Sequence, residues 1–227
     1  MADIPAGLKD FLKSCRLPDN KWAELEKLQD LLHLLVAANK KTNLTRITSA
    51  SDYWIKHIAD SLSIGRFLPE IMSAPYRVAD VGCGAGFPLL PLAWANPRLT
   101  TVGIEAKQKK TDFIESATRK LGIQNCTVIP RQMREAADLP EYRASFDIIV
   151  ARAVKNAALV VKESHKLLKP VESAQIILYK TPDLVEKEHL PLIKAAAEAG
   201  LTVHYSDIFF LPQNKGRRQF TLVAKRT

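Results

Sequence analysis

One segment constrains the fold of this chain more than any other: a short apolar stretch that leads directly into three glycines at alternate positions. Residues 78–81 read Val-Ala-Asp-Val, Gly82, Gly84 and Gly86 follow, and Pro88 comes two residues later. Glycine allows the backbone to turn sharply and lets a ligand approach the main chain closely. Proline suits the first turn of a helix, where its missing N–H is not needed. The segment therefore predicts a buried strand, a tight turn open to a ligand, and a helix.

Beyond residue 76, short apolar runs alternate with longer amphipathic ones. Such an alternation predicts an α/β fold whose parallel sheet is covered by helices on both faces. The apolar runs cover residues 77–81, 99–104, 127–129, 146–151 and 174–179, and the helical patterns cover 88–95, 107–121, 156–168 and 184–199.

The two ends of the chain follow other patterns. Near the start, Leu25, Leu28, Leu32 and Leu35 recur at three- and four-residue steps, which places them on one helical face. A second helical stretch covers 51–67, and the polar segment 40–46 between them is expected to be a loop. We therefore expect a helical extension over residues 1–70, packed on a core domain over residues 71–227. At the tail, residues 203–211 and 220–224 flank a turn-rich segment, which predicts an antiparallel pair.

Composition and charge narrow the class of protein. Hydrophobic residues make up 47% and charged residues 25% of the 227, as in globular proteins. No apolar run approaches the ~20 residues of a membrane helix, and the start shows no signal-peptide pattern, so we expect a cytoplasmic protein. The net charge of +9 favours a polyanionic partner, although many basic proteins bind none. The three cysteines are far apart and form no CxxC, so neither a disulfide framework nor a metal site is indicated.

The spacing of the glycines indicates the kind of ligand. A dinucleotide fingerprint reads GxGxxG, whereas here the third glycine comes two places after the second and Phe87 follows it. This loop suits a ligand without a pyrophosphate. Glu105 comes nineteen residues after Gly86, at the end of the next apolar run, where a carboxylate can accept hydrogen bonds from both hydroxyls of a ribose. A glycine-rich turn followed by an unrelated surface glutamate is the alternative, but the whole succession favours a nucleoside-type cofactor.

This succession resembles the class I methyltransferases that bind S-adenosylmethionine, and the tail resembles the hairpin that ends their sheet. Further motifs, in their order between about residues 40 and 153, are similar to the bacterial 16S rRNA guanine-N7 methyltransferase family, once called glucose-inhibited division protein B. Cys83, Glu105 and Gln132 depart from the usual residues of that family. The motifs are Asn43-Leu44-Thr45, His57-Ile58-Ala59-Asp60-Ser61-Leu62, Asp80 to Pro88 with Pro91-Leu92-Ala93, Lys109-Lys110 with Phe113, and Ala151-Arg152-Ala153.

The resemblance implies a Rossmann-like, mostly parallel seven-stranded sheet with an antiparallel last strand. It also implies S-adenosyl-L-methionine as cofactor and methyl transfer to N7 of a guanine in the 530 loop of 16S rRNA, in free RNA or in the small-subunit particle. We expect the chain to be a monomer. The expected cofactor-binding residues are Asp80, Gly82, Gly84, Gly86, Phe87, Glu105, Gln132, Met133 and Arg152.

Several of these residues have a plain structural alternative. The forked donors of Arg152 match guanine O6, a phosphate or the cofactor carboxylate, but an arginine can also cap a strand end. Phe87 could pack on the cofactor or belong to the core, and Gln132 and Met133 could flank adenine or form a loop. His57 lies three residues before Asp60 on one helical face, where a histidine is more often structural than catalytic.

The expected RNA-binding residues are basic or amide side chains spread along the chain. Lysines that open a helix oppose its dipole, which indicates either a phosphate contact or a solvated charge run. Asn43 could reach the target base or cap the loop. The candidates are Asn43, Arg46, Lys109, Lys110, Arg217 and Arg218.

The expected chemistry needs no acid or base. Guanine N7 carries a lone pair and no proton, so the protein has only to align N7 with the methyl carbon. The sequence has no Ser/His/Asp set and no paired carboxylates that would indicate acid–base catalysis, and we assign none. Three alternatives stay open: a methyltransferase for another RNA, one for a small molecule or protein, and a non-catalytic RNA-binding protein with a degenerate pocket. A dinucleotide oxidoreductase is disfavoured by the glycine spacing.

Overall fold

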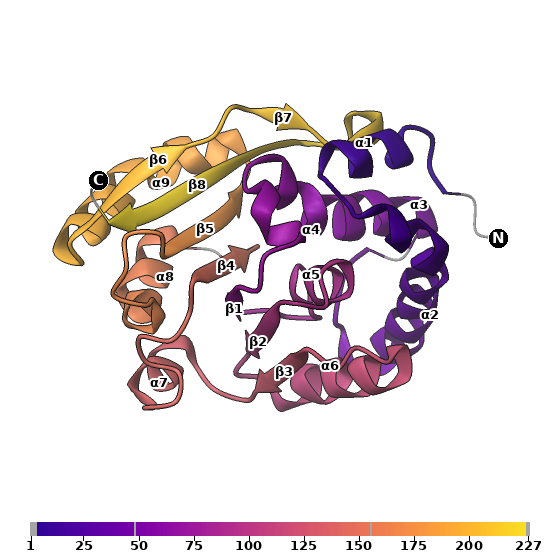
Figure 1. Cartoon of the computed structure of the whole chain (residues 1–227), viewed down its shortest axis with the longest axis horizontal. Helices are drawn as coiled ribbons and strands as arrows, with labels where there is room; N and C mark the ends of the chain where they lie inside the picture. Colours follow the sequence, from indigo (N-terminus) through magenta and orange to yellow (C-terminus); the bar gives the residue numbers. More distant parts are fainter. Residues whose placement is uncertain (1–3, 48, 155, 226–227) are drawn as a thin grey trace.

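A central, mostly parallel sheet organises the molecule (Figure 1). The computed structural model describes residues 4–47, 49–154 and 156–225. Within these residues the strands follow the order β3-β2-β1-β4-β5-β8-β6, and the two-residue β7 pairs with β8. The first five strands run parallel, whereas β8 runs antiparallel to both of its neighbours. The strands are β1 (Arg77–Val81), β2 (Thr100–Ile104), β3 (Cys126–Ile129), β4 (Ile148–Arg152), β5 (Gln175–Lys180), β6 (Leu201–Tyr205), β7 (Phe209–Phe210) and β8 (Arg217–Lys225).

The sheet confirms the expected fold, including the antiparallel strand at the tail. The strand order reverses at β1, which pairs with β2 on one side and with β4 on the other. Open α/β sheets bind their ligands at the carboxyl ends of the strands beside such a reversal. The three glycines follow β1, Glu105 follows β2, and Arg152 ends β4. The topology therefore gathers these residues, far apart in the sequence, at one edge of the sheet.

Successive strand residues point to opposite faces of the sheet, and both faces carry apolar side chains. Helices therefore cover both faces. Val78 joins the core beneath α5 and α6, whereas Ala79 joins the core beneath the other three helices. The N-terminal helices pack on the first face (Figure 1). The helices after β1 are α5 (Leu89–Ala95), α6 (Gln108–Leu121), α7 (Met133–Asp138), α8 (Ala157–Ser164) and α9 (Pro182–Glu198), and short 3₁₀ turns cover His165–Leu167 and Pro212–Asn214.

The N-terminal region is helical, as the leucine spacing predicts, but its boundaries differ from the prediction. The expected helix over 51–67 is interrupted by a π-helical turn, Trp54–Ala59. The loop expected from Lys40 begins instead at Asn43, since lysines are favourable in the last turn of a helix. The elements are α1 (Leu8–Ser14), a 3₁₀ turn (Asp19–Glu24), α2 (Leu25–Thr42), α3 (Ala50–Tyr53), the π-helical turn, α4 (Asp60–Leu62) and 3₁₀ turns at Ser63–Arg66 and Pro69–Met72.

The N-terminal helices share one hydrophobic core with the sheet. Leu12 and Trp54 are buried in the same cluster as Val78 and Leu90. The proposed division between residues 70 and 71 stays a prediction. Among the described residues, no helix combines the length and the apolar character that a membrane span requires.

Candidate active site

A cavity of about 550 Å³ opens at the carboxyl ends of β1, β4 and β5. Its wall comes from the glycine turn after β1, the segment after α2, the π-helical turn, the ends of β4 and β5, and the start of β8. Six of its lining residues are cationic and one, Asp60, is acidic, but Lys56, Lys110 and Lys180 each pair with a carboxylate outside the lining. The remaining positive charge, on Arg46 and on the two arginines that share Asp60, favours an anionic ligand. The cationic residues are Arg46, Lys56, Lys110, Arg152, Lys180 and Arg218.

The glycine turn (residues 82–86) forms one wall of this cavity. Its three glycines have φ angles of +70°, +59° and +85°, in the left-handed region that L side chains rarely adopt. A Cβ at Gly84 would meet no heavy atom closer than 3.9 Å, so the space beside this residue is open to a ligand. At Gly86, by contrast, a Cβ would come within 2.7 Å of Leu90 and prevent the packing of α5. Gly82 and Gly84 line the cavity, and Gly86 lies behind them.

Asp80 is buried next to the glycine turn and does not line the cavity. Its carboxylate accepts a hydrogen bond of 3.0 Å from the backbone N–H of Leu89, the first residue of α5. The side chain is 1% exposed and does not line the cavity, and its other oxygen has no partner among the described residues. Burial raises the pKa of Asp80 to about 7, partly offset by the hydrogen bond from Leu89 and the charge of Arg152. The structure therefore gives Asp80 a role in holding the turn.

Glu105 lies beside the glycine turn with much of its hydrogen-bonding capacity already used. It accepts N–H hydrogen bonds from Gly84 at 3.1 Å and from Lys107 at 3.0 Å. The ammonium group of Lys110 lies 3.5 Å from the oxygen that Gly84 contacts. A carboxylate accepts about four hydrogen bonds, so Glu105 can still receive a ribose hydroxyl, and a second one if Lys110 withdraws. The open turn and this carboxylate fit the expected cofactor.

Arg152 lines the cavity at the end of β4, but most of its donors are bound to protein. Its Nε donates to the carbonyl of Phe87 at 3.3 Å. Its Nη1 donates to the carbonyl of Lys56 at 2.7 Å and to Asp60 at 3.0 Å, and its Nη2 lies 3.0 Å from Nδ1 of His57. A guanidinium has five N–H groups, so one is left for a ligand. Arg152 thus fastens the N-terminal helices to the glycine turn.

A second arginine shares the same carboxylate. Arg218 donates to both oxygens of Asp60, at 2.8 and 3.2 Å, and lines the cavity. Asp60 is 4% exposed at its side chain, against 12% for Arg152 and 19% for Arg218. One carboxylate cannot neutralise two guanidinium groups, so this wall keeps an excess positive charge. We call His57, Asp60, Arg152 and Arg218 the arginine cluster.

His57 and Phe87 link the two walls. Their rings stack with centroids 4.2 Å apart and an angle of 12° between their planes. Burial, together with the positive charge of Arg152, lowers the pKa of His57 to about 3. The histidine is therefore neutral at physiological pH and bonded at both ring nitrogens, to Arg152 and to Thr45. These contacts favour the structural role expected for His57, and they make Phe87 part of the cavity wall as well as of the core.

Other predicted residues lie outside this cavity. Gln132 is exposed and begins α7 in a capping box with Glu135, and Met133 packs partly into the second core. Asn43 ends α2 with a φ of 48°, a conformation that asparagine tolerates. Their expected contacts with the cofactor and the RNA stay predictions.

Four basic candidates form two pairs of adjacent residues in the sequence, and in the structure the two members of each pair have different environments. Lys109 is exposed, whereas Lys110 turns to Glu105 and lines the cavity. Arg217 is exposed beside Asp183 at 3.3 Å, whereas Arg218 belongs to the arginine cluster.

Thr45, Lys56 and Lys180 are among the lining residues that were not assigned to the site from the sequence. Thr45 lies in the motif Asn-Leu-Thr, but nothing in its spacing indicated a hydrogen bond to His57. Lys56 contributes its backbone carbonyl to Arg152, and Lys180 pairs with Glu188 at 2.7 Å. His57, Arg152 and Arg218 were named from the sequence for other reasons, and only the three-residue spacing of His57 and Asp60 indicated a contact within this wall.

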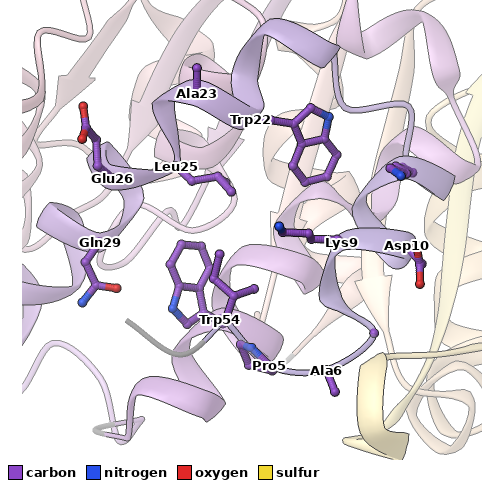
Figure 2. Close-up of a pocket in the computed structure, with 13 residues that line it drawn as sticks. Pro5, Ala6, Lys9, Asp10, Trp22, Ala23, Leu25, Glu26, Gln29 and Trp54 are labelled. Carbon is purple, nitrogen blue, oxygen red and sulfur yellow. The ribbon is translucent and has the colours of Figure 1, made fainter. Parts of the chain in front are cut away.

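A larger cavity, of about 840 Å³, lies among the N-terminal helices (Figure 2). Trp22 and Trp54 line it together with Leu25, and the side chain of Lys9 points toward them. It contains no residue predicted for the cofactor or the RNA. Size alone therefore does not identify the active site, and the smaller cavity carries the chemistry.

The strand order, the antiparallel strand and the glycine turn after β1 together define a class I methyltransferase that uses S-adenosyl-L-methionine. Solved structures agree on the fold. A methyltransferase from Aquifex aeolicus that depends on this cofactor has a TM-score of 0.52 and 17% identity, covering 70% of this chain and 88% of its own. The fibrillarin of Aeropyrum pernix, solved with natively bound S-adenosyl-L-methionine, has a TM-score of 0.51 and 13% identity, covering 66% and 67%.

Sequence comparisons give the family. The family model described as rRNA small subunit methyltransferase G matches residues 24–203. The ribosomal RNA small subunit methyltransferase G of Synechococcus sp. (strain JA-3-3Ab) is 32% identical over 234 residues, covering 99% of this chain and 89% of that protein. The protein of the same name from Leuconostoc mesenteroides is 30% identical, covering 90% and 84%. The chain belongs to the rRNA small subunit methyltransferase G family, which confirms the expected enzyme class and cofactor.

Proposed function

We propose that this enzyme methylates N7 of a guanine in the 530 loop of 16S rRNA. The observation that carries the proposal is one cavity that joins an open glycine turn to six cationic side chains. A nucleoside-type cofactor needs the turn and the carboxylate beside it. A cofactor alone does not need the positive charge left on Arg46 and on the two arginines that share Asp60, whereas an RNA backbone does. Membership of the rRNA small subunit methyltransferase G family supports the choice of RNA.

The state of the acidic and histidine side chains suits N7 as the acceptor. His57 is neutral, and both its nitrogens are bonded. Asp60 is held between two arginines, and Asp80 lies behind the turn, outside the cavity. None of the three is free to remove a proton from a substrate. A lone pair on a ring nitrogen needs no such removal, so positioning is sufficient for the reaction.

The residues around the turn would hold the cofactor. Gly82 and Gly84 offer an open backbone, Glu105 offers an acceptor for a ribose hydroxyl, and Phe87 offers an apolar face. When bound, S-adenosyl-L-methionine supplies an electrophilic methyl group on a sulfonium. The chain's own part is to fix this group and the guanine in line.

The cationic wall would hold the RNA. Arg46 and Arg218 line the cavity. Lys109 and Arg217 are exposed, and each directly precedes a lining residue, Lys110 and Arg218. N7 faces the deep, narrow major groove of an RNA helix, which side chains do not enter, so the target must lie in a loop or leave the stack. We further propose that the enzyme acts as a cytoplasmic monomer on the small-subunit RNA or its particle.

The test is methyl transfer in vitro with labelled cofactor and small-subunit RNA. Two RNAs are compared, one with guanine and one with 7-deazaguanine at the target, since the analogue replaces only the nucleophilic nitrogen. We expect label on the guanine RNA alone. Label on the analogue at that nucleotide would show that N7 is not the acceptor. Label on neither RNA, under conditions where the cofactor binds, would favour a different substrate.

A further inference from the structure

A chain of hydrogen bonds runs from the arginine cluster to the hydroxyl of Thr45, a residue that lines the cavity. It starts at Arg152, whose Nη2 lies 3.0 Å from Nδ1 of His57. A guanidinium only donates hydrogen bonds, so Nδ1 is the acceptor and carries no hydrogen. The neutral ring then carries its single hydrogen on Nε2. The tautomer of His57 is thus set by the arginine.

The next link gives the hydroxyl of Thr45 its polarity. Nε2 of His57 lies 3.0 Å from Oγ1 of Thr45 and must donate to it. The backbone N–H of Ile47 also donates to this oxygen, at 3.0 Å. Both lone pairs of the hydroxyl oxygen are therefore occupied, and its hydrogen is left as a donor. Among the described residues, Thr45 Oγ1 makes no further hydrogen bond.

The position of this donor is fixed as firmly as its polarity. Asn39 holds the backbone of Thr45 from both sides, accepting from its N–H at 2.9 Å and donating to its carbonyl at 2.8 Å. The ring of His57 is held by its stack on Phe87. Thr45 lines the same cavity as Gly84. A ligand in this cavity therefore meets a preset donor at Thr45.

We propose that Thr45 is a specificity-determining residue that reads O6 of the target guanine. This inference rests on the proposed function, because it assigns the donor to the base that is methylated. Guanine carries two acceptors side by side on this edge, N7 and O6, whereas adenine carries an amino group in place of O6. A hydroxyl that can only donate pairs with O6 and leaves the adenine amino group without an acceptor. The same donor that favours guanine thus disfavours adenine.

The experiment compares Thr45→Val, which removes the hydroxyl at nearly constant shape, with Thr45→Ser, which keeps it. Each is assayed on RNA with guanine and on RNA with 2,6-diaminopurine at the target, an analogue that keeps N7 but has an amino group at position 6. On guanine we expect Thr45→Val to lower kcat/KM about 10-fold, the worth of one hydrogen bond, and Thr45→Ser to stay within about 3-fold of the wild type. On diaminopurine the valine variant should match or exceed the wild type.

Three other results would overturn the inference. An equal loss on both RNAs would show that the hydroxyl does not read position 6 and contacts another acceptor, such as a phosphate. A loss of cofactor affinity in Thr45→Val, measured by calorimetry, would assign the donor to the cofactor. A fall in melting temperature that accounts for the lost activity would leave only a structural role. If instead the wild type itself fails on guanine RNA, or modifies 7-deazaguanine, the proposed function fails and this inference falls with it.

Discussion

The two walls of the cavity are built in opposite ways. The glycine turn is made of backbone, follows one strand, and spans five consecutive residues. The arginine cluster is made of side chains from three distant segments, and partly buried hydrogen bonds join both arginines to one carboxylate and Arg152 to His57. Backbone conformation is a local property, whereas a network of charges depends on the whole fold. A substitution in the glycine turn should therefore act through local backbone strain. A substitution in the arginine cluster should act by leaving a charge without its partner.

The largest expected effect comes from the shared carboxylate. Asp60→Asn leaves two guanidinium groups without their counter-ion at a site that is mostly buried. Removing one partner of a buried pair destabilises strongly, so we expect the free energy of unfolding to fall by about 3 kcal/mol. Denaturant unfolding measures it.

Asp183→Asn is the matched control. Asp183 pairs with Arg217, the sequence neighbour of Arg218, but both side chains are more than half exposed. An exposed pair of this kind contributes little, so we expect a change below about 0.5 kcal/mol. Equal effects of the two substitutions would remove the distinction between the buried cluster and the surface.

The next largest effect is expected from a substitution in the glycine turn. Gly84→Val places a branched side chain at a φ of +59° beside the open cavity. The strained conformation costs about 1–2 kcal/mol, and the side chain also occupies ligand space. We expect the cofactor affinity to fall at least about 10-fold by calorimetry, the equivalent of about 1.4 kcal/mol.

Gly122→Val separates strain from position. Gly122 ends α6 at a φ of +65° with no heavy atom within 4 Å of a Cβ, far from the lining of the cavity. This variant should lose stability and keep its cofactor affinity. If both valine variants bind the cofactor as the wild type does, the turn is not the cofactor site.

A pH titration sharpens the account of the cluster. His57 stays neutral in the fold down to pH of about 3, because burial and the charge of Arg152 lower its pKa from 6.5. Below pH 6.5 the unfolded chain takes up a proton that the folded chain refuses, so His57 makes the protein less stable as the pH falls. The stability of the wild type relative to His57→Gln should drop by about 1.4 kcal/mol per pH unit between pH 6.5 and pH 4. A difference that does not change with pH would mean that His57 is not held neutral.

The smallest effect concerns the lysines at the start of α6. Lys109→Ala should weaken RNA binding about 3-fold, lower the slope of log affinity against log salt by about 0.7–0.9, and leave the cofactor affinity unchanged. Lys110→Ala should raise the cofactor affinity about 3-fold, because its ammonium group competes for Glu105. Calorimetry and filter binding separate the two. Identical behaviour of the two variants would contradict the different positions of these neighbours.

The sequence predicted the backbone wall well, because its signals are local. Strand, alternate glycines and helix follow one another within eighteen residues, 78–95, and the structure places them as expected. The acid after the next strand, Glu105, also lies beside Gly84, since parallel strands end at one edge of a sheet. The contact between Lys110 and Glu105 was not predicted from the sequence. Lys110 lies in the first turn of the next helix, and the sequence pattern does not indicate the direction of its side chain.

The side-chain wall was predicted only in part. Arg152 was expected to meet a ligand, yet four of its five N–H groups bind protein, and their partners lie 65 to 96 residues away. No local pattern encodes such pairings. The π-helical turn before Asp60 was also not predicted, because its apolar spacing is close to that of an α-helix. Gln132 has a local role that the sequence did not predict, a capping box with Glu135 at the start of α7, and its expected contact with the cofactor stays a prediction.

The most direct test of the central claim is mass spectrometry of 16S rRNA from cells that lack the gene for this chain. Three complementing genes are compared: the wild type, Gly84→Val and Asp183→Asn. We expect 7-methylguanosine at one nucleotide of the 530 loop to be absent without the gene, restored by the wild type and Asp183→Asn, and not restored by Gly84→Val. An unchanged 530 loop in cells without the gene, or loss of the methyl group at another nucleotide only, would contradict the account.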